Sequence, residues 1–76
     1  MIYVYIDMSK NIQSVLFDKS KFTIDDAIHW ALSHGFIVKK VDETLNKYRF
    51  RQFNPNYKYK YYTKKITKGI EFIIAY

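Results

Sequence analysis

The sequence predicts an α+β domain in which a single helix packs on one face of a mostly antiparallel sheet of four to six strands. Three observations carry this prediction. One segment repeats apolar residues at helical spacing, several segments alternate apolar with polar residues, and Gly, Pro or Asn separates them. A length of 76 residues accommodates one domain, residues 1–76, and not two.

The helix is expected over residues 24–34. Thr23 is a suitable N-cap, and Asp25 and Asp26 suit the positive end of the helix dipole. Gly35 should end the helix in the left-handed conformation that helix C-termini favour. The apolar residues at helical spacing form one stripe that the sheet should bury, namely Ile24, Ala27, Ile28, Ala31 and Leu32.

Strands are expected on both sides of the helix. Residues 2–6 and 12–17 precede it, so that residues 1–11 would form an added N-terminal strand or hairpin arm. Segments 36–42, 46–53, 57–63 and 70–76 follow it. A short connection at residues 42–46 predicts one hairpin, and Asn54-Pro55-Asn56 predicts a second that pairs segment 46–53 with segment 57–63. Segment 70–76 is almost continuously apolar, which indicates a central strand.

Positive charge is concentrated in the second half of the chain. Residues 1–38 contain three lysines and four aspartates, a net charge of −1, whereas residues 39–76 contain ten basic and three acidic residues, a net charge of +7. Such asymmetry indicates an anionic partner on one face. The competing interpretation is a surface that lysine merely keeps soluble, since 11 of the 13 basic residues are Lys.

The candidate binding residues follow from the two-residue period of a strand. Side chains at positions 47, 49 and 51 should share one face, and a hairpin around Pro55 would add positions 58 and 60 to it. Alternate residues on a strand lie about 7 Å apart, close to the spacing of phosphates in a nucleic acid. The predicted cationic face comprises Lys47, Arg49, Arg51, Lys58 and Lys60, extended by Lys64 and Lys65.

Two functions remain open at this stage. The first is a small basic module that binds nucleic acid, with Lys and Arg on phosphates and exposed Tyr stacked on bases. The second is a protein-interaction or assembly module, including a homodimer, that uses a Tyr-rich surface and an open strand edge. Eight tyrosines in 76 residues suit either function.

An enzyme is the least favoured interpretation. His29 and His34 are five residues apart, which places them about 140° apart around a helix and off any shared ligand face. Asp42 and Glu43 are expected to bridge to Arg49 or Arg51 instead of forming a catalytic pair. The sequence therefore predicts no catalytic residue, no metal, no cofactor and no small-molecule substrate.

The expected location is intracellular or within a virion, not secreted. The chain has no cysteine, and its apolar opening lacks the basic region of a signal peptide. No apolar run approaches the ~18 residues that a membrane-spanning helix needs. No membrane partner is therefore expected.

Several short strings together resemble a known domain family. They are residues 13–17 (QSVLF), 22–23 with Ala27 and Trp30, 34–36 (HGF), 40–44 (KVDET) and 48–52 (YRFRQ), with 61–66 and 69–71 similar to longer versions. Over residues 12–55 the chain resembles a small uncharacterised domain of tailed phages and nucleocytoplasmic large DNA viruses. The resemblance implies a viral source, a compact domain and an association with virion genes, and it assigns no site residue. With a viral source, the protein-interaction alternative becomes virion or capsid assembly or binding of a host factor.

Overall fold

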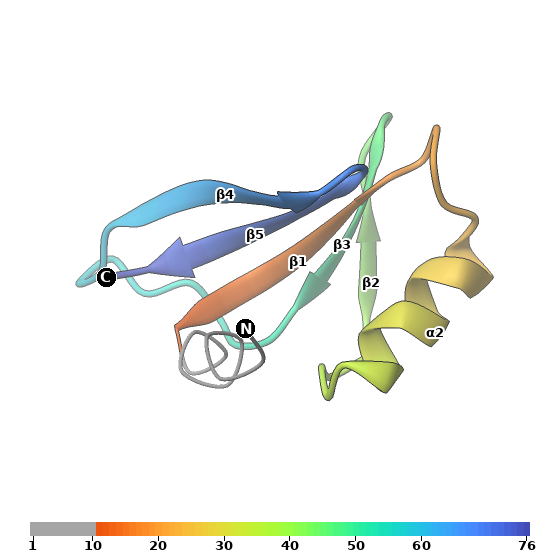
Figure 1. Cartoon of the computed structure of the whole chain (residues 1–76). Helices are drawn as coiled ribbons and strands as arrows, with labels where there is room; N and C mark the ends of the chain where they lie inside the picture. The colour runs from red at the N-terminus through yellow and green to blue at the C-terminus, as the bar shows by residue number, and fades with distance from the viewer. Residues whose placement is uncertain (1–10) are drawn as a thin grey trace.

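The computed structural model describes residues 11–76, which form one α-helix and a five-stranded sheet (Figure 1). In chain order the elements are β1 (Ile12–Asp18), α2 (Ile24–Ser33), β2 (Val41–Glu43), β3 (Lys47–Arg51), β4 (Tyr61–Thr67) and β5 (Ile70–Ala75). The predicted α+β class is confirmed. The expected strand at residues 2–6 lies outside the described residues.

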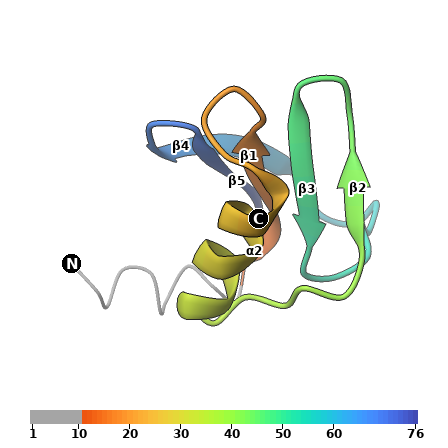
Figure 2. The same cartoon turned by 90° about the vertical axis from the view of Figure 1, so that its right-hand side faces the viewer.

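Strand β1 is the centre of the sheet, and a hairpin flanks it on each side. The strand order is β2-β3-β1-β5-β4, and every neighbouring pair runs antiparallel. The β2–β3 hairpin and the helix α2 are seen side by side in Figure 2. The predicted hairpin at residues 42–46 is confirmed, and β5 is an interior strand as expected, because β1 and β4 pair with its two edges.

Both ends of α2 form as the sequence predicts. The Thr23 hydroxyl accepts a hydrogen bond from the Asp26 N–H at 3.1 Å, and this bond caps the N-terminus. At the C-terminus, Gly35 adopts a φ of +80°. Its N–H donates to the Leu32 carbonyl at 3.1 Å, and the Phe36 N–H donates to the Ala31 carbonyl at 2.9 Å, which is the Schellman pattern.

The core lies between α2 and one face of the sheet. Phe17 is at its centre, with ring centroids 5.3 Å from Phe22, 5.7 Å from Trp30 and 5.1 Å from Phe50. The residues buried in this cluster are Ile12, Val15, Phe17, Ala27, Ala31, Phe36, Phe50, Ile70, Phe72 and Ile74. The two alanines let the helix backbone approach the aromatic rings closely.

One residue of the predicted helical stripe does not join the core. Leu32 is 60% exposed, so its predicted burial is wrong. Trp30 packs against the core instead, and its ring stacks on His34 with ring centroids 3.8 Å apart. The larger indole surface buries more apolar area than a leucine would at the edge of this small sheet.

The strand expected over residues 36–42 is only three residues long. Residues 36–40 are irregular, and pairing with β3 begins at Val41. The Gln52 side chain accepts a hydrogen bond from the Ile37 N–H at 2.8 Å and donates one to the Ile37 carbonyl at 3.1 Å. A side-chain amide therefore replaces the backbone pairing that a longer strand would have made here.

The strand expected over residues 57–63 begins four residues later than predicted. Residues 57–59 form a turn, which the Asn56 side chain stabilises by accepting from the Lys58 N–H at 2.9 Å. The predicted hairpin between this segment and β3 is wrong, because β1 and β5 lie between β3 and β4. The alternation of Tyr with Lys over residues 57–61 is typical of a strand, but the first residues of this segment form an Asx-type turn instead.

The two glycines test how steric contact adds to backbone strain. Both have φ near +80°, but a Cβ on Gly69 would lie 2.8 Å from the Lys21 Cβ, whereas one on Gly35 would meet nothing within 4 Å. We expect Gly35→Ala to cost about 1 kcal/mol and Gly69→Ala about 2 kcal/mol or more. Urea unfolding followed by circular dichroism measures both. Equal costs would show that the contact with Lys21 adds nothing.

Candidate nucleic-acid interface

The three cations of β3 share one face of the sheet, as the sequence predicts. Phe50 points into the core, so Lys47, Arg49 and Arg51 project to the opposite side, called here the second face. By strand register the second face also carries Ser14, Leu16, Asp42, Thr63, Lys65, Glu71 and Ile73. It therefore mixes both signs of charge with apolar residues.

Carboxylates on the same face pair with two of these three cations. The Lys47 ammonium lies 3.2 Å from a Glu71 carboxylate oxygen and spans β1 to reach it. The Arg51 guanidinium lies 3.4 Å from the Asp42 carboxylate, which confirms one of the bridges expected for Asp42. Such partly exposed pairs contribute little to stability, but they reduce the positive potential available to an anion.

Arg49 lies in the middle of the second face and is half-buried. Its cross-strand neighbour on β1 is Leu16, which is only 7% exposed. The Arg49 Nε is buried and has no hydrogen-bond partner among residues 11–76. The aliphatic part of the arginine therefore serves as cover for the sheet, and its charged end has no carboxylate within ion-pair distance in the same residues.

The remaining predicted cations lie at the far edge of the sheet. Lys58 is in the turn before β4, Lys60 directly precedes that strand, and Lys64 and Lys65 are within it. The expectation that Lys58 and Lys60 share one surface with the three cations of β3, called here the β3 row, is wrong. It required β3 and β4 to be neighbours, and two strands separate them.

One side of the β4 edge carries an alternating row of lysine and tyrosine. Tyr62 is opposite Ile74, a core residue, so Tyr62 and Lys64 project to the side of the sheet that faces α2. Lys60 has the same parity. Tyr76 lies beside Tyr62, with ring centroids 5.4 Å apart in an edge-to-face arrangement. These four exposed residues, Lys60, Tyr62, Lys64 and Tyr76, are called here the β4 strip.

Hydrogen bonds fix the geometry at the start of the β4 strip. Lys60 and Tyr76 exchange two backbone hydrogen bonds of 2.9 Å, which extend the β4–β5 ladder by one pair. The Tyr61 hydroxyl accepts from the Asn56 N–H at 2.7 Å and donates to the Asn56 carbonyl at 3.0 Å. The turn at residues 57–59 is thereby tied to the strand, and the lysines on either side of it have defined positions.

No carboxylate neutralises this edge among the residues that the structure describes. The three ion pairs of residues 11–76 involve Lys19, Lys47 and Arg51, and none involves a lysine between positions 58 and 68. The sequence already contains the reason, because no acidic residue occurs between Glu43 and Glu71. The same acid-free run also contains β3, so it does not distinguish the two strands, but it does include Lys68, which the sequence prediction omitted.

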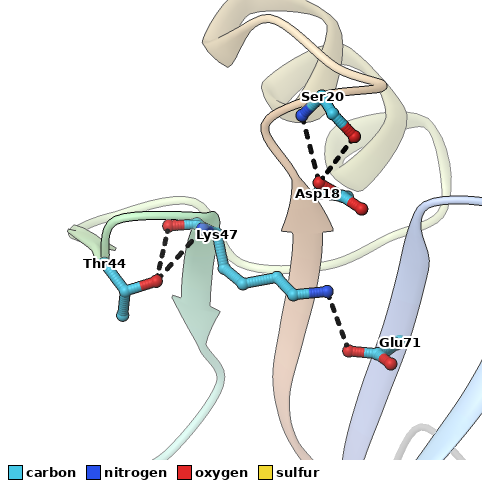
Figure 3. A network of polar contacts seen from close by, with 5 residues as sticks. All are labelled: Asp18, Ser20, Thr44, Lys47 and Glu71. Carbon is cyan, nitrogen blue, oxygen red and sulfur yellow. Dashed lines mark hydrogen bonds and ion pairs between the residues drawn. The ribbon is translucent and has the colours of Figure 1, made fainter.

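A cluster of polar side chains lies where β1 ends, near the turn between β4 and β5 (Figure 3). The Asp18 carboxylate accepts from the Ser20 N–H at 3.0 Å and from the Ser20 hydroxyl at 2.9 Å. These hydrogen bonds, aided by the charges of Lys47 and Lys21, hold the pKa of Asp18 below its ordinary value of 3.8. Asp18 therefore remains ionised to a lower pH than an unperturbed aspartate would.

Residues 11–76 contain no group of three His, Cys, Asp or Glu side chains that could hold a metal ion. In the same part of the chain, no helix has the length and apolar character required to cross a membrane.

No family model matches the chain, and neither a curated protein nor a solved structure matches it. The resemblance to a viral domain family therefore stays a prediction.

The ionisation of Asp18 predicts a pH dependence of stability. A carboxyl whose pKa is lowered by folding stabilises the fold above its unfolded pKa, and this contribution disappears as the pH falls through the folded pKa. Asp18→Asn keeps an oxygen that can accept from Ser20 but loses the charge. We expect the variant to be less stable than the original at pH 7 and equally stable in strong acid. Urea unfolding at several pH values measures this, and a difference independent of pH would contradict it.

Proposed function

We propose that this protein binds single-stranded nucleic acid along the β4 strip, without catalysing a reaction. The observation that carries the proposal is the combination of exposed lysines that lack carboxylate partners among residues 11–76 with exposed tyrosine rings between them. Of the predicted cationic face, this assignment keeps Lys58, Lys60, Lys64 and Lys65 and leaves out the three cations of β3.

The lysines of the edge supply the contacts to phosphate. Lys60 and Lys64 flank Tyr62 on the same side of β4, with about 7 Å between alternate positions of the strand. Lys58 and Lys68 lie before and after the strand, Lys65 projects to its other side, and all five lysines are exposed. A flexible single strand can follow such a row, because its backbone adjusts to the spacing of the cations.

The tyrosines supply surfaces on which bases can stack. Tyr62 is 47% exposed, and Tyr76, which lies against it, is 65% exposed. Bases stack on aromatic side chains irrespective of sequence, which suits a binder with little base specificity. Paired bases in a duplex do not offer their faces, and this favours single strands over double strands.

The competing use of the same edge is the addition of a strand from another protein. β4 is an edge strand of the described sheet, so its outer backbone groups could pair with a second copy or a partner peptide. Two copies paired through β4 would bring lysines close to lysines, which is unfavourable, and exposed lysine is a common protection of strand edges.

We expect the protein to be a monomer when its mass is measured by size-exclusion chromatography with light scattering. A stable dimer would favour the protein-interaction module instead.

Salt dependence tests the phosphate contacts. For labelled oligo(dT), fluorescence anisotropy should give a log–log slope of affinity against salt of about −3.5 if five lysines contact phosphates. The double variant Lys60→Gln, Lys64→Gln should reduce the magnitude of this slope by about 1.4 and weaken binding roughly tenfold at moderate salt.

The matched control removes the same charge elsewhere. Lys39 and Lys40 are exposed and precede β2, at the opposite edge of the sheet. The double variant Lys39→Gln, Lys40→Gln should leave the slope and the affinity within twofold of the original. If both double variants weaken binding equally, net charge and not the β4 strip is responsible, and absence of binding at low salt would refute the proposed function.

Substitution of Tyr62 separates stacking from charge. Tyr62→Ala should weaken binding to oligo(dT) by about 1–3 kcal/mol and leave the salt slope unchanged, because a stacked ring contributes without releasing counterions. Tyr62→Phe keeps the ring and should bind like the original. Equal binding by the Ala and Phe variants, both shown to be folded by circular dichroism, would exclude a stacking role.

A further inference from the structure

A pocket of about 280 Å³ lies beside the turn between β4 and β5, on the second face of the sheet, whereas the β4 strip projects to the side that faces α2. Its charged residues come from three separate stretches of the chain, namely the end of β1 with the turn after it, β3, and the β4–β5 hairpin, and only two of the six are acidic. They are Asp18, Lys21, Lys47, Lys65, Lys68 and Glu71. Four positive and two negative charges leave the pocket with a net charge of +2.

Both carboxylates of the pocket already have partners. Asp18 accepts two hydrogen bonds from Ser20, and Glu71 pairs with Lys47 at 3.2 Å (Figure 3). The other three ammonium groups, on Lys21, Lys65 and Lys68, have no carboxylate within ion-pair distance among residues 11–76. Three like charges brought to one pocket repel one another, and a bound anion would relieve that repulsion.

The backbone holds Lys21 against the β4–β5 turn. The Asp18 N–H donates to the Gly69 carbonyl at 2.8 Å, and the Lys21 N–H donates to the Asp18 carbonyl at 3.0 Å. Lys21 packs so closely on Gly69 that a Cβ there would lie 2.8 Å from the Lys21 Cβ. Lys21 thus belongs to the pocket through fixed backbone contacts and not only through the reach of a flexible side chain.

We infer that this pocket binds a phosphate group, and specifically the terminal phosphate of the nucleic-acid strand that lies along β4. The inference rests on the proposed function for the identity of the ligand. A terminal monoester carries close to two negative charges at neutral pH, whereas an internal phosphodiester carries one. Three unpartnered ammonium groups therefore favour the strand end, which would reach the pocket from the β4 strip by passing over the β4–β5 turn that carries Lys68.

Three forms of one oligonucleotide test the inference. Oligo(dT) labelled at an internal base is titrated with a 5′-phosphate, with a 3′-phosphate and with hydroxyl groups at both ends. One phosphorylated form should bind about fivefold more tightly than the form without a terminal phosphate, and the end that does so gives the polarity of the strand. Equal affinities for all three forms would overturn the inference and leave the proposed function intact.

Lys21 provides the matched variants, because it belongs to the pocket and not to the β4 strip. Lys21→Gln should abolish the preference for a terminal phosphate and leave the affinity for the unphosphorylated oligonucleotide within twofold of the original. Lys21→Arg should keep the preference. A preference that survives in Lys21→Gln would place the terminal phosphate outside this pocket.

Inorganic phosphate distinguishes failure of the pocket from failure of the proposed function. If no oligonucleotide binds at low salt, the proposed function fails, and the terminal-phosphate inference fails with it. Phosphate-dependent shifts of the Lys68 and Gly69 amide signals in NMR, absent in Lys21→Gln, would then still identify an anion site. Without such shifts, the pocket binds no phosphate of any kind.

Discussion

Phe17 on the central strand contacts Phe22, Trp30 and Phe50, and this aromatic cluster holds the only helix of the described chain against the sheet. A domain of this size buries little surface, so these rings supply much of its stabilisation. One ten-residue helix covers only one face of a five-stranded sheet. The second face of the sheet is therefore covered by the side chains of polar and charged residues, with Leu16 and Ile73 among them.

In the described part of the chain, the cations at the centre of the sheet have carboxylate partners or cover apolar residues, whereas those at the β4 edge have no carboxylate partner. On the second face, Lys47 and Arg51 pair with Glu71 and Asp42, and the stem of Arg49 covers apolar residues. These cations shield the uncovered side of a thin core from water. Along β4 the lysines form no ion pair among the described residues, and their charge is therefore available to bind an anion. That edge is for this reason the better candidate for nucleic-acid binding.

Local sequence signals predicted the elements well and their neighbours less well. The caps at Thr23 and Gly35 and the short loop before β3 depend on adjacent residues, so pattern alone places them. The sequence predicted that β3 and β4 are neighbours, and they are not. The turn between two successive strands does not decide which distant strands pair, because packing in the core decides it. The candidate site shared this error: the residues of the β3 row do share a face, whereas Lys58 and Lys60 belong to another surface.

The stack of Trp30 on His34 gives the molecule a built-in optical probe. The chain has a single tryptophan, and its indole ring lies 3.8 Å from the imidazole, centroid to centroid, at an interplanar angle of 12°. The indole also meets Phe17 of the aromatic core in an edge-to-face contact, with ring centroids 5.7 Å apart. The emission of this one fluorophore therefore reports directly on whether the last turn of the helix remains seated on the sheet.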